Sequence, residues 1–171
     1  MDTLQAIRTR RSIRRFTPEP VAGESVQQLL AAAMCAPSAA NQQAWHFVIV
    51  DERELLDRVP EFHDYCPFIR EAPLAVVVCG DLNREQFAGR FWVQDCSAAT
   101  QNLLLAAHEL GLGAVWCAVY PVASRDVGLR RLLNLPQHLV PLNLVVVGHP
   151  AAAGEAVDRY DSGRITWNRF A

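Results

Sequence analysis

The fold of this chain depends most on the stretch WVQDCSAATQNLLLAAHEL, residues 92–110. It predicts one long helix that is mostly apolar, although Asn102 and Glu109 show that its faces differ. A helix that is apolar nearly all round is usually buried on several sides. Gly111 and Gly113 follow at once, and glycine is common just beyond the end of a helix. We therefore expect this helix to lie in the core or in an interface between subunits.

Apolar runs and capping signals place the other elements on both sides of this helix. Strands are expected at residues 45–50, 74–80, 114–119 and 142–147. Shorter helices are expected from the Asp2 capping box to Thr9, from the Ser25 capping box to before Pro37, at 52–59 and at 124–133. This alternation predicts a single α/β or α+β domain over residues 1–171, without repeats or linkers.

The last part of the chain, residues 155–171, is predicted to be an arm without its own core. It is polar, and Tyr160, Trp167 and Phe170 are its apolar anchors. An exposed arm together with an apolar long helix indicates a homodimer, although such an arm can also be simply loose.

Composition excludes several classes of protein. The formal net charge of -2 and the pI near 6.2 argue against a nucleic-acid partner. No stretch approaches the roughly 20 apolar residues of a membrane span. The five cysteines are scattered without CxxC spacing, which argues against a zinc site or a disulfide framework and favours a reducing cytoplasm. All 16 basic residues are arginine, so a Walker-type phosphate loop, which needs lysine, is excluded.

Arginines gather near the N-terminus, in the run Arg10-Arg11-Ser12-Ile13-Arg14-Arg15-Phe16. Guanidinium groups beside a serine hydroxyl can hold a small dianion such as a phosphate through charge-assisted hydrogen bonds. Read alone, the same run is also compatible with a solvated helix end, because cations are favoured near the C-terminus of a helix.

Three further segments carry polar groups that suit a ligand. The segment from Pro37 to Phe47 includes Ser38, Asn41, Gln42 and Gln43. The side-chain amides of the last three suit the edge of a heteroaromatic ring, although such groups can also simply hydrogen-bond to the backbone of their own loop. Gly111 to Pro121 lacks the GxGxxG spacing of a dinucleotide site and offers a backbone N–H near Ala118 and Val119. Tyr160 to Trp167 places Arg164 on the arm.

Together, and in this order, the four segments resemble the nitroreductase family of FMN-dependent oxidoreductases. The resemblance rests on Arg10 to Phe16, Pro37 to Trp45, Gly111 to Trp116 and Tyr160 to Trp167, and it covers nearly the whole chain. It implies an α+β fold with a central, mostly antiparallel sheet flanked by helices. It also implies a homodimer that exchanges its C-terminal arms and binds FMN at the subunit interface.

The resemblance assigns roles to particular residues. Arg10, Arg11, Ser12 and Arg14 would hold the FMN phosphate and part of the ribityl chain and ring, and Arg164 would reach the phosphate from the arm. Pro37, Ser38, Asn41 and Gln43 would meet the flavin bound by the other subunit, and the backbone of Ala118 and Val119 would approach its ring. Two residues depart from the family pattern: Ala44 replaces a proline, and Ala118 replaces a glycine.

The implied activity is electron transfer from NADH or NADPH to a small electron-poor acceptor, such as a nitroaromatic or a quinone, by a ping-pong mechanism. None of the five histidines stands out as a catalytic acid or base, which fits chemistry carried by a flavin. The short segment 81–91, in place of a longer lid, indicates an open pocket. Two alternatives remain open: a flavin store or redox sensor without turnover, and a specialised flavoenzyme such as a dehalogenase or dehydrogenase.

Overall fold

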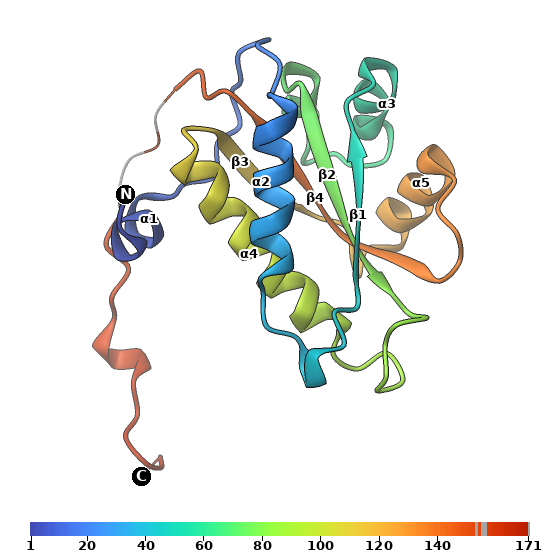
Figure 1. Ribbon diagram of the computed structural model, residues 1–171. Coiled ribbons are helices and arrows are strands. Elements are labelled where there is room, and N and C mark those ends of the chain that lie inside the picture. The colour runs from blue at the N-terminus through green and yellow to red at the C-terminus, as the bar shows by residue number, and fades with distance from the viewer. Residues whose placement is uncertain (153, 155–156, 171) are drawn as a thin grey trace.

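The computed structural model describes residues 1–152, 154 and 157–170, and its centre is a four-stranded sheet. The strands lie in the order β1-β2-β4-β3, and every neighbouring pair is antiparallel. Helices α2 and α4 lie side by side on one face, and α3 and α5 lie toward the other (Figure 1). This arrangement confirms the predicted α+β fold with helices on both sides of an antiparallel sheet.

The predicted strands and main helices are all present. The strands are β1 (Trp45–Val50), β2 (Leu74–Asp81), β3 (Gly113–Ala118) and β4 (Leu139–Gly148). The α-helices are α1 (Thr3–Thr9), α2 (Gly23–Met34), α3 (Arg53–Arg58), α4 (Trp92–Glu109) and α5 (Ala123–Leu133). Short 3-10 turns complete the elements: η1 (Ala39–Asn41), η2 (Val59–Glu61), η3 (Pro67–Glu71) and η4 (Ser162–Arg164).

Of the two predicted capping boxes, one is an N-cap and one is not. The carboxylate of Asp2 accepts a hydrogen bond from the backbone N–H of Gln5 at 2.8 Å, as predicted. The prediction for Ser25 is wrong, because α2 already begins at Gly23. Ala22 has an extended backbone, and its carbonyl accepts the first helical hydrogen bond from the N–H of Val26.

The long helix α4 lies in the core, as the sequence predicts. Leu103 and Cys96 are fully buried, in a cluster that also contains residues of α2 and of the central strands. Trp92, at the start of α4, packs on Gly80 of β2, where an added Cβ would lie 2.3 Å from the indole ring. The absence of a side chain at residue 80 therefore allows the helix to approach the sheet closely.

The arginine-rich segment lies along the edge of the sheet beside β3. The backbone N–H of Ile13 donates to the carbonyl of Ala114 at 3.1 Å, and Ser12 bridges to the same residue in parallel. Ile13 packs over Gly113, where a Cβ would lie 2.7 Å from its side chain. These contacts fix the backbone between Arg10 and Arg14.

The described part of the C-terminal arm extends away from the rest of the molecule (Figure 1). Its apolar anchors Trp167 and Phe170 are 85% and 86% exposed. Residues 155, 156 and 171 of the predicted arm lie outside the described residues. In the described part of the chain, no helix combines the length and the apolar character that crossing a membrane requires.

Truncation of a core residue of α4 should measure how much the fold depends on this helix. Leu103→Ala should lower the free energy of unfolding by about 2–5 kcal/mol, because it removes a fully buried side chain and leaves a cavity. Urea denaturation measures the loss. Leu110→Ala, at an exposed position just after the helix, is the control and should cost less than about 1 kcal/mol. Equal losses in the two variants would contradict the central position of α4.

Candidate functional site

Four of the residues predicted to bind a ligand line one cavity of about 410 Å³. We call it the arginine pocket, and its lining residues are Arg10, Arg11, Ser12, Arg14, Gly154 and Arg159. Sequence reasoning missed Arg159, which comes from the start of the arm. Arg11 explains how it arrives there, because its Nη2 donates to the carbonyl of Val157 at 3.3 Å.

The arginine pocket is strongly positive. Burial lowers the pKa of Arg10, and repulsion from Arg11 and Arg159 lowers it further. Within the described residues, none of Arg10, Arg14 and Arg159 forms an ion pair with a carboxylate. Clustered guanidinium groups repel one another, and a bound dianion would remove that repulsion. The pocket is therefore suited to a phosphate group.

A second group of predicted residues forms the loop around η1. The hydroxyl of Ser38 accepts from the backbone N–H of Gln43 at 3.0 Å, and Gln43 Nε2 donates to Asn41 Oδ1 at 3.1 Å. Asn41 is exposed, and no other described residue accepts a hydrogen bond from its amide nitrogen. Its NH₂ group can therefore donate to an acceptor atom of a ligand.

Within one chain, the η1 loop and the arginine pocket lie apart. The loop is attached to the first turn of α4, where Asp95 Oδ1 accepts from the backbone N–H of Ala39 at 2.9 Å. Next to Arg10, Thr9 Oγ1 lies 2.7 Å from the Nε2 of His108, in the last turn of the same helix. At 1.5 Å per residue, Asp95 and His108 are separated by about 20 Å along the helix. The loop and the arginine pocket thus lie at opposite ends of α4.

The end of β3 is partly reachable by a ligand. Ala118 is exposed, and its carbonyl accepts from His63 Nε2 at 3.0 Å and from Arg125 Nη1 at 2.8 Å. Val119 is fully buried, and its N–H donates to the carbonyl of Leu142 at 3.0 Å. The N–H of Val119 is therefore used by the fold. Ligand contact at Ala118 and Val119 stays a prediction.

The remaining predicted residues lie apart from the arginine pocket. Arg164 Nε forms an ion pair with Asp161 Oδ2 at 3.0 Å, on the exposed arm. Pro37 is exposed beside Ser38 at the start of the η1 loop. Contact of Arg164 with a phosphate stays a prediction.

Known proteins resemble the chain over nearly its whole length. The model of the Nitroreductase family matches residues 7–64 and 61–149. A Methanothermobacter thermautotrophicus protein, provisionally named NADH dehydrogenase/NAD(P)H nitroreductase, is 48% identical over 165 residues, which are 96% of this chain and 86% of that protein. A crystal structure with the same provisional name, from Parabacteroides distasonis, has a TM-score of 0.93 and 41% identity, covering 98% of each chain.

A further solved structure contains a ligand. It is a provisionally identified nitroreductase from Desulfovibrio desulfuricans in complex with FMN, with a TM-score of 0.83 and 32% identity. The match covers 100% of this chain and 99% of that one.

The contribution of Arg159 to anion binding can be measured directly. Arg159→Ala should weaken binding of inorganic phosphate at least about tenfold, because a charge-assisted hydrogen bond contributes roughly 1.5–3 kcal/mol. The measurement is the rise in melting temperature as phosphate is added at constant ionic strength. Arg8→Ala, at an exposed position outside the pocket, is the control and should respond like the wild type. An unchanged response of Arg159→Ala would exclude this residue from the site.

Proposed function

This chain belongs to the nitroreductase family, and on that premise we propose that it is an FMN-dependent oxidoreductase. It takes electrons from NADH or NADPH and passes them to a small electron-poor acceptor, such as a nitroaromatic or a quinone. The observation that carries this proposal is the arginine pocket, because the positive charge of Arg10, Arg14 and Arg159, which form no ion pair with a carboxylate among the described residues, matches the phosphate of FMN. The FMN in the complex with the Desulfovibrio desulfuricans relative supports the same cofactor.

The residues of the arginine pocket bind and orient the phosphate end of the cofactor. Arg10, Arg14 and Arg159 supply positive charge and hydrogen-bond donors, and Ser12 supplies an exposed hydroxyl. Arg11 contributes from a guanidinium that already donates to the carbonyls of Arg10 and Val157. Bound FMN supplies the chemistry, since its ring accepts a hydride from the nicotinamide and returns electrons to the acceptor.

The η1 loop binds the ring edge in a site shared by two copies of the chain. Asn41 donates from the amide nitrogen that Gln43 leaves free by bonding to its oxygen. Pro37 and Ser38 lie beside it, and Ala118 is the exposed part of β3. Since loop and pocket are about 20 Å apart along α4, a second copy brings the loop to the cofactor held by the first.

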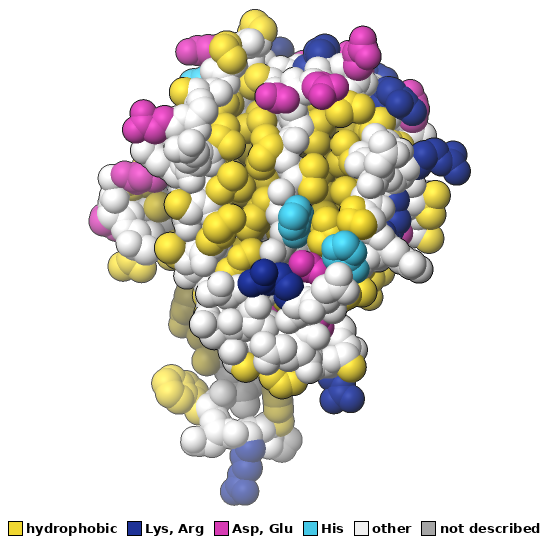
Figure 2. Space-filling view, turned by 45° about the vertical axis from the view of Figure 1, so that its right-hand side comes forward, with side chains coloured by type: hydrophobic (Ala, Val, Ile, Leu, Met, Phe, Trp, Pro, Cys, Tyr) yellow, Lys and Arg dark blue, Asp and Glu magenta, His cyan; other side chains and the backbone are white. Residues whose placement is uncertain are grey.

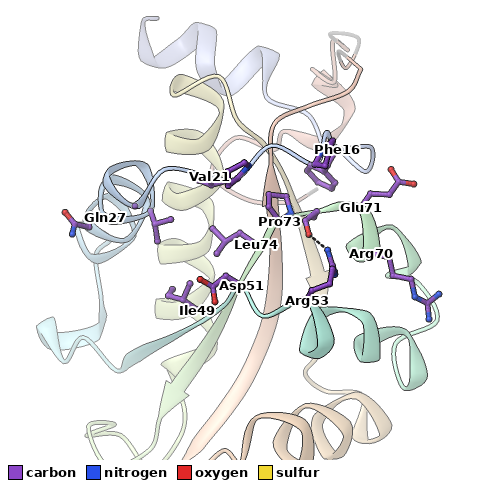
Figure 3. Close-up of a pocket in the computed structure, with 15 residues that line it drawn as sticks. Phe16, Val21, Gln27, Ile49, Asp51, Arg53, Arg70, Glu71, Pro73 and Leu74 are labelled. Carbon is purple, nitrogen blue, oxygen red and sulfur yellow. Dashed lines mark hydrogen bonds between the residues drawn. The ribbon is translucent and has the colours of Figure 1, made fainter.

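The edge strand β1 and the arm supply surfaces for such a dimer. Among the described residues, β1 pairs only with β2. Figure 2 brings the right-hand side of Figure 1 forward and shows hydrophobic side chains gathered across the face in view. A groove of about 1090 Å³ opens at the end of β1. Figure 3 shows Phe16, Val21 and Leu74 along it. The arm of the partner copy, with its exposed aromatic residues, is the occupant we propose for this face.

The cofactor can be tested by titration. The purified wild type should bind FMN at least about tenfold more tightly than riboflavin, because only FMN has the phosphate that the arginine pocket binds. Quenching of flavin fluorescence gives both affinities.

Anaerobic mixing of the holoprotein with NADH or NADPH should then bleach the flavin, and an acceptor such as a quinone should restore its colour. A protein that stays colourless with FMN would refute the proposal, and a bound flavin that neither nucleotide reduces would indicate a flavin store or sensor instead.

The arm can be tested by removing its aromatic anchors. The double variant Trp167→Ser/Phe170→Ser should raise the dimer dissociation constant by about tenfold or more, because two large apolar side chains lose their contact. Light scattering over a dilution series measures it. Tyr65→Ser, at an exposed aromatic residue of the body, is the matched control. A wild type that is monomeric at every concentration contradicts the shared site.

A further inference from the structure

Beneath the η1 loop lies a buried polar pair, Gln42 and Asp95, which are 5% and 4% exposed. Asp95 belongs to the first turn of α4, where the helix dipole favours a negative charge. Its Oδ1 accepts from the backbone N–H of Ala39 at 2.9 Å, and its Oδ2 accepts from Gln42 Nε2 at 2.7 Å. The carboxylate thus attaches the loop to the helix at two points.

The amide of Gln42 also bonds to a second segment. Its Nε2 donates to Glu85 Oε2 at 3.2 Å, and its Oε1 accepts from the backbone N–H of Gln86 at 2.9 Å. Carboxylates accept hydrogen bonds and backbone N–H groups donate them, so the amide fits in one orientation only. Both hydrogens of the NH₂ group face a carboxylate. No residue type other than an amide offers two donors and an acceptor in this arrangement.

The attachment points of the loop surround a strained backbone. Ala40, Asn41 and Gln43 have φ values of 46°, 54° and 50°, in the left-handed region that residues with side chains seldom adopt. Such conformations are unfavourable for residues with a side chain and persist only where surrounding contacts fix them. The bonds at Ala39 and Gln42 lie immediately before and after Ala40 and Asn41. Together with the bond from Gln43 Nε2 to Asn41 Oδ1, they fix the direction of the Asn41 side chain.

The second segment is residues 82–91, the part of the short segment 81–91 that follows the end of β2 at Asp81, and we call it the lid. Glu85 Oε1 accepts from the backbone N–H of Phe87 at 2.9 Å, and the rings of Phe87 and Phe91 meet edge to face at 5.2 Å. The lid is thus joined to the η1 loop through a single amide side chain.

We propose that Gln42 and Asp95 are positioning residues that hold Asn41 against the flavin and couple its placement to the order of the lid. This inference rests on the proposed function, because it takes Asn41 to contact the flavin ring. Neither residue touches the cofactor in this scheme. They act through the loop, so that the ring contact and the lid change together.

An exchange of the two groups tests the coupling. Gln42→Glu places a third carboxylate beside Asp95 and Glu85, and Asp95→Asn turns an NH₂ group toward that of Gln42. The triple variant Gln42→Glu/Asp95→Asn/Glu85→Gln restores both side-chain bonds of residue 42 with donors and acceptors exchanged, since without Glu85→Gln the new carboxylate at position 42 would still face that of Glu85. Each of the single variants Gln42→Glu and Asp95→Asn should slow anaerobic reduction of bound FMN about tenfold or more and shift its absorbance spectrum, and the triple variant should recover to within about threefold of the wild type.

A readout independent of the cofactor follows the same variants. In Gln42→Asn, whose shorter side chain cannot reach both segments, amide hydrogen exchange should accelerate in residues 38–43 and in 82–91 together. This variant keeps the charge unchanged, so it also serves if Gln42→Glu does not fold. Gln28→Glu, which makes the same chemical change as Gln42→Glu at an exposed position of α2, is the matched control and should behave like the wild type.

The outcomes separate this inference from the proposed function. In one outcome, the single variants have a lower melting temperature while the rate of FMN reduction and the flavin spectrum stay unchanged. That result would show that Gln42 and Asp95 are only structural, and it would overturn the inference. A triple variant no better than the worse single variant, or hydrogen exchange that accelerates in one segment alone, would also overturn it. A wild type that does not bind FMN refutes the proposed function instead.

Discussion

Helix α4 packs its apolar residues against the sheet and against α2 beside it, and both groups of candidate site residues are attached near its ends. Asp95 at the start of the helix holds the η1 loop, and His108 near its end contacts Thr9, next to the arginine pocket. The buried residues between them, such as Leu103, keep the helix at a fixed height above the strands. A shift of α4 would therefore move both parts of the site.

The arginine pocket shows why the local arrangement of charge matters more than its total. The chain as a whole has a formal net charge of -2, yet Arg10 is partly buried among guanidinium groups. Backbone geometry holds these groups together, through the bond from Ile13 to Ala114 and the space left by Gly113. Packing at the sheet edge thus offsets the repulsion among the clustered guanidinium groups.

Periodic features of the sequence predicted most of the fold. The apolar runs of β1 and β2 and the long pattern of α4 are local signals, and the structure places them within a few residues of the expected ends. The start of α2 was misjudged because Ser25 looks like a cap, while the backbone turns into the helix at Ala22 without a side-chain cap. A helix can begin at any of two or three neighbouring positions, and the sequence alone seldom shows which residue is the cap.

The arrangement of the candidate site could also be predicted only in part, because only residues close in the sequence give a local signal. Arg10 to Arg14 are neighbours in the sequence, so their clustering was visible. Arg159 joins them only because the chain returns to the pocket more than a hundred residues later, and no local pattern announces such a contact. The sequence marks Gln42 only as one of several amides in its loop, and its burial against Asp95 gives it a different place, which no local pattern indicates.

The placement of the loop and the pocket at opposite ends of α4 has a consequence for behaviour at low protein concentration. In a site composed of halves from two copies, cofactor retention and subunit association are linked equilibria. In the dimer proposed above, dilution that separates the copies would also release the cofactor, and added cofactor would draw the copies together. The quantity of this protein in a cell would then set the fraction that carries flavin, so that expression level itself acts as a control on activity.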